Sequence, residues 1–446
     1  HTYTSGKTRS AEWREAQLDA LLRVLEEGGE AMVAAVQEDF GKPYTEAYGT
    51  DIAFTATEVG HIKKHFRSWM RPRKASLRVK DLPGKGWIQP EPLGVALVIA
   101  PWNYPIQLLI APMAAAIAAG NTVVAKPSEL TPNTSRVMSE LLREHLDPEA
   151  FAVLEGGVDV STKLLEERWD HIFFTGSTPV GKIVAKAAAE HLTPTVLELG
   201  GKSPAVVTAD ADLKVAAHRM AWGKFLNAGQ TCIAPDYVLV DNKVKDEFVD
   251  TFVGVINEFF GDEPTKSPDL TQVVNDRHVS RLEGLLDDHG GTVVIGGAVD
   301  PETRKLAPTV IVDPDLDSAL MSEEIFGPIL PIIGVDNIDD AIALINGRDK
   351  PLALYIFAKD DKKSQAIIDR TSSGGVCVNH TLMHIITPAL PFGGVGASGQ
   401  GRYHGQQGFE EFSNLKPILK KPNWAEVSLL YPPYNATKTK ILKKFL

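Results

Sequence analysis

The chain has 446 residues, which is more than one hydrophobic core usually organises, so we expect two or three domains. Hydrophobic residues make up 43% and charged residues 23%, as in an ordinary globular protein, and this excludes disorder over most of the length. The net charge of -11 argues against a nucleic-acid-binding surface, which needs clustered Lys and Arg. Two cysteines cannot form a disulfide framework, so we expect a reducing compartment, the cytoplasm.

The first 70 residues are predicted to be helical, because apolar residues recur at helical spacing between about residues 10 and 69. One apolar face of this predicted helix must pack against another part of the protein. It is formed by Leu18, Leu21, Leu22 and Leu25. Residues 71–92 then become rich in Arg, Lys, Pro and Gly. This change of composition predicts a projecting arm without a core of its own.

The most apolar region covers residues 95–125, and prolines and a Gly-Asn pair interrupt it before it reaches the about 20 apolar residues of a membrane span. No integral membrane segment is therefore expected. The pattern predicts a strand at 95–100, a buried helix ending at Gly120 and a strand at 122–125. A helix at 133–145 and strands at 151–154 and 171–174 follow. This alternation predicts a doubly wound parallel sheet, which binds ligands at the carboxyl ends of its strands.

Lys126 and Glu129 come just after one of these predicted strand ends. There they could hold the ribose hydroxyls of a nucleotide, although an ordinary capped loop is the alternative. The acid would disfavour a 2′-phosphate and the lysine would favour it, so the choice between NAD and NADP stays open.

Residues 175–183 nearly match the phosphate-binding loop of nucleoside triphosphatases. That pattern ends in Ser or Thr to bind magnesium, and Ile183 has no hydroxyl, which disfavours the triphosphatase hypothesis. The Gly176–Ser177 turn before a helix can still place backbone amides near a pyrophosphate. Residues 394–399 spell a dinucleotide fingerprint, but no clear strand precedes them and no helix follows, so we interpret them as a glycine-rich loop.

Glu198 ends a short apolar run at 195–197 that predicts a buried strand. A carboxylate between Leu197 and Leu199 is partly desolvated, which raises its pKa toward that of a general base. The alternative is an ion pair between Glu198 and Lys202.

Cys232 follows a predicted helix that begins after Asp210 or Asp212 and ends near residues 227–229. A thiol in a polar loop is accessible, and its thiolate is nucleophilic. The alternative is a buried inert cysteine, which fits Cys377 better. A base and a nucleophile at the two ends of one connecting helix are typical of covalent catalysis.

A second α/β pattern begins at Tyr237, with strands at 237–240, 292–295, 329–335 and 352–357 and helices at 244–259 and 339–345. Within it, Glu324 and Phe326 lie in a loop where they could contact the sugar and ring of a ligand. A surface acid beside a core aromatic is the alternative. The Lys-rich tail from residue 423 is expected to be a loosely attached terminus, with a neighbouring subunit or anionic lipid as other possible contacts.

Several short motifs together resemble the aldehyde dehydrogenase superfamily, over essentially the whole chain. They occur in the family's order at residues 101–105, 126–129, 174–177, 198–202, 229–232, 324–328 and 391–394. The details at 102–105, 175–182 and 230–237 are most similar to the class 3 branch.

The resemblance implies two doubly wound α/β domains and a β-arm for oligomerisation. The expected division is a Rossmann-like cofactor domain at 1–73 and 93–198, a catalytic domain at 199–399, an arm at 74–92 and 413–423, and a tail at 424–446. It also implies a homodimer.

The resemblance further implies oxidation of medium- to long-chain aliphatic or aromatic aldehydes to carboxylic acids with NAD or NADP. Cys232 would form a thiohemiacetal and then a thioester, the Asn103 side chain and the Cys232 backbone N–H would hold the oxyanion, and Glu198 would activate water. No metal is expected. The cofactor contacts implied are Lys126 and Glu129 on the adenosine ribose, Gly176 and Ser177 at the pyrophosphate, and Glu324 and Phe326 at the nicotinamide ribose and ring. The residues expected to line an apolar substrate pocket are Tyr104, Trp222 and Phe392, with structural packing as the alternative for each.

Two other functions compete with this interpretation. A coenzyme A-acylating aldehyde dehydrogenase passes the thioester to a thiol and does not need the base, so Glu198 argues against it. A non-catalytic binding protein would be expected to have lost Cys232, Asn103 or Glu198, and all three are present.

Overall fold

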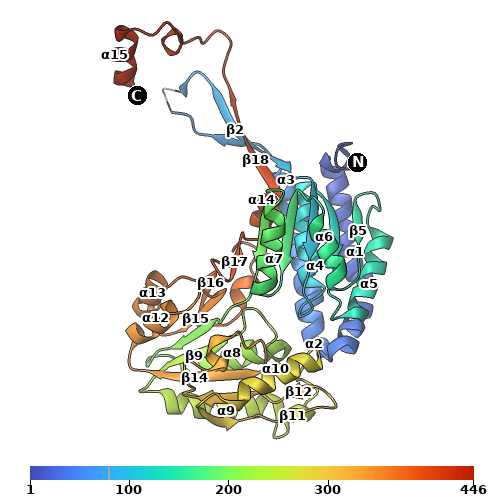
Figure 1. The fold of residues 1–446 in the computed structure, drawn as a ribbon, viewed down its shortest axis with the longest axis vertical. Helices are drawn as coiled ribbons and strands as arrows, with labels where there is room; N and C mark the ends of the chain where they lie inside the picture. Colours follow the sequence, from blue (N-terminus) through green and yellow to red (C-terminus); the bar gives the residue numbers. More distant parts are fainter. Residues whose placement is uncertain (79–80, 446) are drawn as a thin grey trace.

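The computed structural model describes residues 1–78 and 81–445. Val79 and Lys80 of the predicted arm and Leu446 of the predicted tail lie outside the described residues. Figure 1 shows two α/β domains, one above the other, with a long arm that rises from the upper domain.

The upper domain is built on a six-stranded sheet of order β17-β7-β6-β3-β4-β5. Its strands are β3 (Val95–Ile99), β4 (Thr122–Lys126), β5 (Phe151–Val153), β6 (His171–Thr175), β7 (Thr195–Glu198) and β17 (Gly399–Gln400). All neighbours are parallel except β17, which pairs antiparallel with β7. The predicted doubly wound parallel sheet is therefore confirmed. The fingerprint-like segment at 394–399 is a loop that leads into β17.

Helices cover both faces of this sheet, as the alternation along β3 requires. Ala96 and Val98 pack with the helices on one face, and Leu97 and Ile99 pack with those on the other. Every residue of α4 (Gln107–Ala119) is buried, because further helices surround it. The helices on its side are α1 (Ala11–Phe40), α3 (Phe54–Trp69), α5 (Pro132–His145) and α14 (Gly405–Glu411), and those on the opposite face are α6 (Val158–Glu166) and α7 (Thr178–Ala189). The apolar composition of residues 95–125 thus reflects a protein core.

The lower domain holds a seven-stranded sheet of order β10-β13-β14-β9-β8-β15-β16, parallel except for its edge strand β10. Its strands are β8 (Pro204–Val207), β9 (Tyr237–Asp241), β10 (Thr292–Ile295), β13 (Thr309–Val312), β14 (Ile329–Val335), β15 (Ala353–Phe357) and β16 (Gly375–Val378). Its larger helices are α8 (Leu213–Phe225), α9 (Lys245–Phe260), α10 (Asp276–Asp287), α12 (Ile338–Asn346) and α13 (Asp361–Arg370).

The connection from Glu198 to Cys232 differs from the prediction. We expected one helix between the two residues, but β8 comes before α8 and is a central strand of the second sheet. The chain therefore crosses from one sheet to the other between Glu198 and Pro204. A four-residue strand that begins with proline gives almost no periodic signal.

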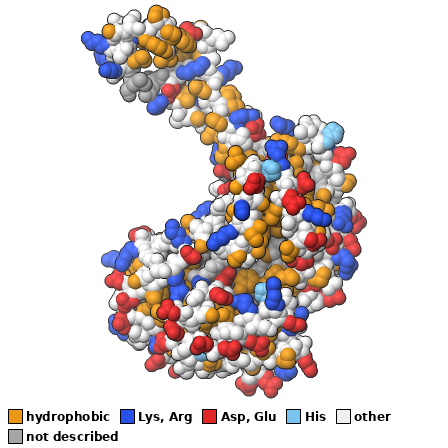
Figure 2. All heavy atoms as spheres, viewed as in Figure 1, with side chains coloured by type: hydrophobic (Ala, Val, Ile, Leu, Met, Phe, Trp, Pro, Cys, Tyr) orange, Lys and Arg blue, Asp and Glu red, His pale blue; other side chains and the backbone are white. Residues whose placement is uncertain are grey.

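The arm is a three-stranded antiparallel sheet of β1 (Arg73–Ala75), β2 (Lys85–Pro92) and β18 (Ser413–Lys420). Beyond it the chain continues into α15 (Ala436–Phe445) (Figure 1). Figure 2 shows hydrophobic and basic side chains together at this far end. Large exposed apolar side chains there are Trp424, Val427, Leu430, Tyr431 and Tyr434. Among the described residues, no helix combines the length and the apolar character needed to cross a membrane.

The core of the upper domain also involves the C-terminal part of the chain, and Phe173 of β6 makes this contact. Phe173 is fully buried, with its ring centroid 5.1 Å from that of Tyr403 and 6.0 Å from that of Phe412. We expect Phe173→Ala to lower the free energy of unfolding by about 3–5 kcal/mol, because it leaves a cavity. Chemical denaturation measures the change. Val158→Ala at an exposed position serves as a control and should change the free energy of unfolding by no more than about 0.5 kcal/mol. A change as small as this in Phe173→Ala would contradict the prediction.

Candidate active site

A cleft of about 1250 Å³ lies between the two domains, at the carboxyl ends of β6 and β7. Both domains contribute to its lining. Among the residues that line it are Asn103, Gly176, Ser177, Glu198, Cys232, Glu324 and Phe326, all of which the sequence analysis selected.

Cys232 lines the cleft after a sharp reversal of the chain. Helix α8 begins after Asp212, as predicted, and ends at Phe225, two residues before the predicted end at 227–229; Asn227 and Ala228 then adopt φ values of 55° and 51°. Gly229 follows with φ 73°, and a Cβ at this position would lie 2.3 Å from the Gly327 carbonyl oxygen. Three successive left-handed residues thus turn the chain so that Cys232 faces the cleft.

The surroundings of Cys232 favour the protonated thiol. Burial raises the pKa of the Cys232 thiol, and the charges of Glu324 and Glu198 raise it further. Formation of a nucleophilic thiolate therefore needs a base or a positive charge that arrives with a ligand.

Glu198 lies at the end of β7 and is only 3% exposed. Neither of its carboxylate oxygens has a hydrogen-bond partner among the described residues. Burial raises the pKa of Glu198 well above its usual range, against a smaller opposite effect of Arg402. A buried carboxylate without a partner is costly and is typical of a functional site.

The alternative ion pair between Glu198 and Lys202 is wrong. The Lys202 ammonium instead contacts Asp236 at 2.5 Å and the carbonyl oxygens of Leu320 at 2.8 Å and Glu323 at 2.7 Å. Lys202 has therefore used its three donors elsewhere.

Asn103 lies in the turn that follows β3 and is 3% exposed. Its side-chain Nδ2 donates to the Gln230 carbonyl oxygen at 3.0 Å. One N–H of the amide is thus anchored to the loop of Cys232, and the other stays available beside the cleft.

Glu324 and Phe326 lie on the lower-domain wall of the cleft. A Cβ at Gly200 would lie 2.0 Å from Glu324 Oε2, so the absence of a side chain there makes room for the carboxylate. Burial, together with the charge of Asp236, raises the pKa of Glu324 to about 8. Phe326 has a φ of 47° and packs edge-on against Trp102, with ring centroids 5.5 Å apart. Left-handed backbone at an aromatic residue is strained and often marks a functional position.

The Gly176–Ser177 turn fits a phosphate group. It immediately precedes α7, whose first turn carries no acidic residue, and the Ser177 side chain forms no capping hydrogen bond within the described chain. Pro179 in the first turn has no N–H, and the N–H groups of Thr178 and Val180 form no hydrogen bond to another backbone group of the described chain. Thr178 lies at the cleft wall. With the buried, unpartnered Thr175 Oγ1 beside them, these groups suit the pyrophosphate of a dinucleotide.

Lys126 and Glu129 contact each other at the carboxyl end of β4, with 2.8 Å between Lys126 Nζ and Glu129 Oε2. The strand that carries them ends at the same edge of the sheet as β6 and β7. Neither residue is among the described residues that line the cleft.

Tyr104, Trp222 and Phe392 are also absent from the described lining of the cleft. The Tyr104 hydroxyl lies 2.6 Å from Thr231 Oγ1, directly before Cys232. Phe392 is buried against the rings of Tyr403 and His404, and Trp222 is 36% exposed and packs against His380.

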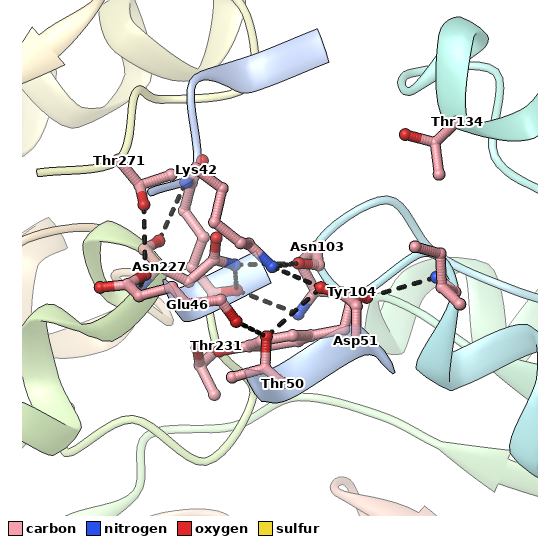
Figure 3. A network of polar contacts seen from close by, with 12 residues as sticks. Lys42, Glu46, Thr50, Asp51, Asn103, Tyr104, Thr134, Asn227, Thr231 and Thr271 are labelled. Atoms are coloured by element: carbon pink, nitrogen blue, oxygen red, sulfur yellow. Dashed lines mark hydrogen bonds and ion pairs between the residues drawn. The ribbon is translucent and has the colours of Figure 1, made fainter. Parts of the chain in front are cut away.

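Sequence reasoning missed the polar residues behind Asn103, which include Lys42, Asp51 and Asn227 (Figure 3). The only local signal was a lysine between Gly41 and Pro43, at the end of a long helix.

The comparisons with known proteins agree on one family. The Aldehyde dehydrogenase family profile matches residues 3–418. Aldehyde dehydrogenase family 3 member A2 of Mus musculus is 45% identical over 446 residues, which cover 100% of this chain and 92% of the relative. The dimeric NADP-preferring aldehyde dehydrogenase of Canis lupus familiaris is 43% identical over 98% of this chain and 97% of the relative. The substrate-bound structure of Staphylococcus aureus AldH superposes with a TM-score of 0.96 at 43% identity, covering 99% of this chain and 96% of that one. The chain belongs to the aldehyde dehydrogenase family.

Proposed function

We propose that Cys232, Asn103 and Glu198 carry out the oxidation of an aldehyde to a carboxylic acid in the cleft between the domains. NAD(P)-dependent aldehyde oxidation is the activity of the family to which the chain belongs. The observation that carries the proposal is the shared cleft, where a thiol and a buried, unpaired carboxylate lie together with an anchored asparagine amide.

In the first step, the Cys232 thiol loses its proton to solvent, and the thiolate Sγ forms a bond to the aldehyde carbon as the carbonyl π bond breaks. The carbonyl oxygen becomes an alkoxide, for which the free N–H of the Asn103 amide and the Cys232 backbone N–H are the proposed donors. A donor aimed at such an oxyanion is typically worth about 2.7–4 kcal/mol. The protein stabilises this charge most effectively if the donors are already fixed, as the Asn103 bond to Gln230 suggests.

The cofactor is NAD or NADP, and relatives are named both as NAD-dependent and as NADP-preferring. When bound, it would accept the hydride that leaves the substrate carbon, and the alkoxide would then collapse to the carbonyl of a Cys232 thioester. We assign the pyrophosphate to the Gly176–Ser177 turn and the nicotinamide ribose and ring to Glu324 and Phe326. Lys126 and Glu129 are proposed to hold the adenosine ribose. Their ion pair places a positive and a negative charge at this position. The lysine would favour the 2′-phosphate of NADP and the glutamate would disfavour it, so an activity assay with each cofactor determines the preference.

In the last step, Glu198 takes a proton from the water that attacks the thioester of Cys232. Its raised pKa supports this role, because a less acidic carboxyl accepts a proton from water more readily. The acid product then leaves and the thiol is restored. Transfer to coenzyme A would not need this carboxylate, so the buried and unpaired state of Glu198 favours hydrolysis.

The substrate class that we propose is medium- to long-chain aliphatic or aromatic aldehydes, with Tyr104, Trp222 and Phe392 on the substrate side of Cys232. The placement of Tyr104 next to Thr231 supports its proximity to the nucleophile. The two free, partly buried cysteines support a reducing, cytoplasmic location.

The domain division is likewise a proposal. The first sheet ends at Glu198, the second begins at Pro204, and the chain returns to the first sheet at Gly399, which supports the boundaries of a catalytic domain at 199–399. The antiparallel pairing of β2 with β18 supports an arm made of 74–92 and 413–423, followed by a tail at 424–446.

The first test measures reduced cofactor from NAD and from NADP, with a medium-chain aldehyde and with benzaldehyde, without coenzyme A. We expect activity in the wild type and none in Cys232→Ala, because the covalent intermediate cannot form. Cys377→Ala is the matched control, since Cys377 lies in β16 outside the described lining of the cleft, and it should keep its activity. Activity that appears only after addition of coenzyme A would support the acylating alternative.

A second prediction concerns Glu198. The substitution Glu198→Gln keeps the shape and removes the base, so we expect a burst of about one reduced cofactor per site followed by turnover reduced about 10²–10⁴-fold. Because only the deprotonated carboxylate is active and its pKa is raised, wild-type turnover should increase as pH rises through that pKa. Rapid-mixing and steady-state pH profiles measure both effects. Unchanged turnover or an unchanged pH profile in the variant would contradict the role.

A third prediction concerns assembly. We propose a homodimer formed through the arm, supported by the dog relative's name and by the exposed apolar side chains of the arm. Sedimentation should give twice the 48.4 kDa of one chain. Leu419 on β18 is 57% exposed, and Leu419→Asp should increase the monomer fraction, whereas Val158→Asp on the surface of the upper domain should not. A wild-type monomer at micromolar concentration would be evidence against the dimer.

A further inference from the structure

A fully buried ion pair lies directly behind Asn103. Lys42 Nζ is 2.9 Å from Asp51 Oδ2, and both side chains are 0% exposed (Figure 3). Lys42 lies between α1 and the short helix Tyr44–Ala47, and Asp51 lies in the π-helical segment Tyr48–Ala53 that follows. The pair does not belong to the described lining of the cleft.

The two charges hold opposite ends of one turn. Lys42 Nζ donates to the Asn103 carbonyl oxygen at 3.1 Å, and the Ile106 N–H donates to Asp51 Oδ1 at 3.3 Å. Between these ends, Lys42 Nζ lies 4.2 Å from the centroid of the Tyr104 ring, within range of a cation–π interaction. The turn from Asn103 to Ile106 is thus clamped at its first residue, its last residue and a ring in between.

The opposite side of this turn is fixed to the loop of Cys232. Asn227 Nδ2 donates to the carbonyl oxygens of both Asn103, at 3.0 Å, and Gln230, at 3.1 Å. Asn103 Nδ2 donates to the same Gln230 oxygen, and the Tyr104 hydroxyl pairs with Thr231. Displacement of the turn would therefore change the position of the Asn103 amide relative to Cys232.

Stability alone is a weak reason for such a pair. The desolvation of two buried charges often cancels their attraction, and apolar residues of similar volume commonly serve stability equally well. The π-helical geometry that carries Asp51 is rare and frequent at functional sites. What the charges provide here is a fixed geometry for the turn that carries Asn103.

We propose that Lys42 and Asp51 form a positioning pair, which sets the Asn103 amide at its place for the oxyanion through the backbone of the 103–106 turn. This inference rests on the proposed role of Asn103 in the oxidation. Misplacement of a reacting group by about 1 Å can cost about 100-fold in rate, so the pair matters without touching the substrate.

A double-mutant cycle tests whether Lys42 acts through Asn103. The substitutions Lys42→Met and Asn103→Ala are made singly and together, and kcat/KM for benzaldehyde is measured at saturating cofactor. We expect Lys42→Met to lower kcat/KM about 10–100-fold when Asn103 is present. When Asn103 is already replaced, the additional loss should be about 2-fold or less, because interacting sites are not additive.

Arg14→Met is the matched control for the loss of a buried cation. Arg14 is 5% exposed and donates to the carbonyl oxygens of Thr8 and Ala118, each at 3.0 Å, at the far end of α4 from the Asn103 turn. The substitution Arg14→Met should lower Tm, and it should change kcat/KM by the same small factor whether Asn103 is present or replaced by alanine. Binding of the reduced cofactor, followed by fluorescence, should stay unchanged in Lys42→Met.

Equal losses for Lys42→Met with and without Asn103 would overturn the proposal, since they would indicate a general structural effect. If Lys42→Met does not fold, the isosteric Asp51→Asn decides in its place, and its loss must likewise depend on Asn103. Wild-type kcat/KM in folded Asp51→Asn would overturn the proposal. If Asn103→Ala alone has no effect, the oxyanion role fails and the positioning role fails with it, whereas failure of the function as a whole would appear as activity that survives Cys232→Ala.

Discussion

The proposed chemistry depends on one constraint, which is that the Glu198 carboxylate is buried and has no hydrogen-bond partner among the described residues. Two cations lie in its vicinity, but their hydrogen bonds go elsewhere. Lys202 contacts Asp236 and two backbone carbonyls, and Arg402 donates to the carbonyl oxygens of Gly374 and Gly393. A direct partner would lower the pKa of Glu198 and weaken it as a base. The lower domain, which holds both sets of partners, thus protects the basicity of a residue in the upper domain.

The other groups at the cleft also come from both domains. The upper domain provides the carboxylate, the asparagine turn and the helix terminus suited to phosphate, and the lower domain provides the thiol, Glu324 and Phe326. Reaction geometry therefore depends on contacts across the boundary between the domains. The hydrogen bond from Asn103 to Gln230 is such a contact. Lys42 supports it by binding the carbonyl oxygen of Asn103. This explains why polar groups are concentrated behind the turn, where most of the surrounding core is apolar.

Much of the upper domain could be predicted from local sequence pattern. The strands β3, β4 and β6 are continuous apolar runs, and the end of α8 follows from Asn227 and Gly229, which tolerate left-handed backbone. β8 was missed because it has only four residues and begins with proline, which argues against a central strand. The partners of charged residues were also beyond prediction. Nothing in the local sequence indicates that Lys202 contacts Asp236, or that Lys42 reaches Asn103, because the fold brings these residues together over long stretches of chain.

The two connections between the domains run side by side. The outgoing chain leaves β7 at Glu198, the returning chain enters β17 at Gly399, and the two pair antiparallel, with a further bond of 3.1 Å from the Leu199 N–H to the Ser398 carbonyl oxygen. A paired double crossing of this kind ties the two domains together through main-chain pairing at the edge of the first sheet, and Glu198 is one of the paired residues. The position of Glu198 is therefore fixed by both connections together and not by one of them alone.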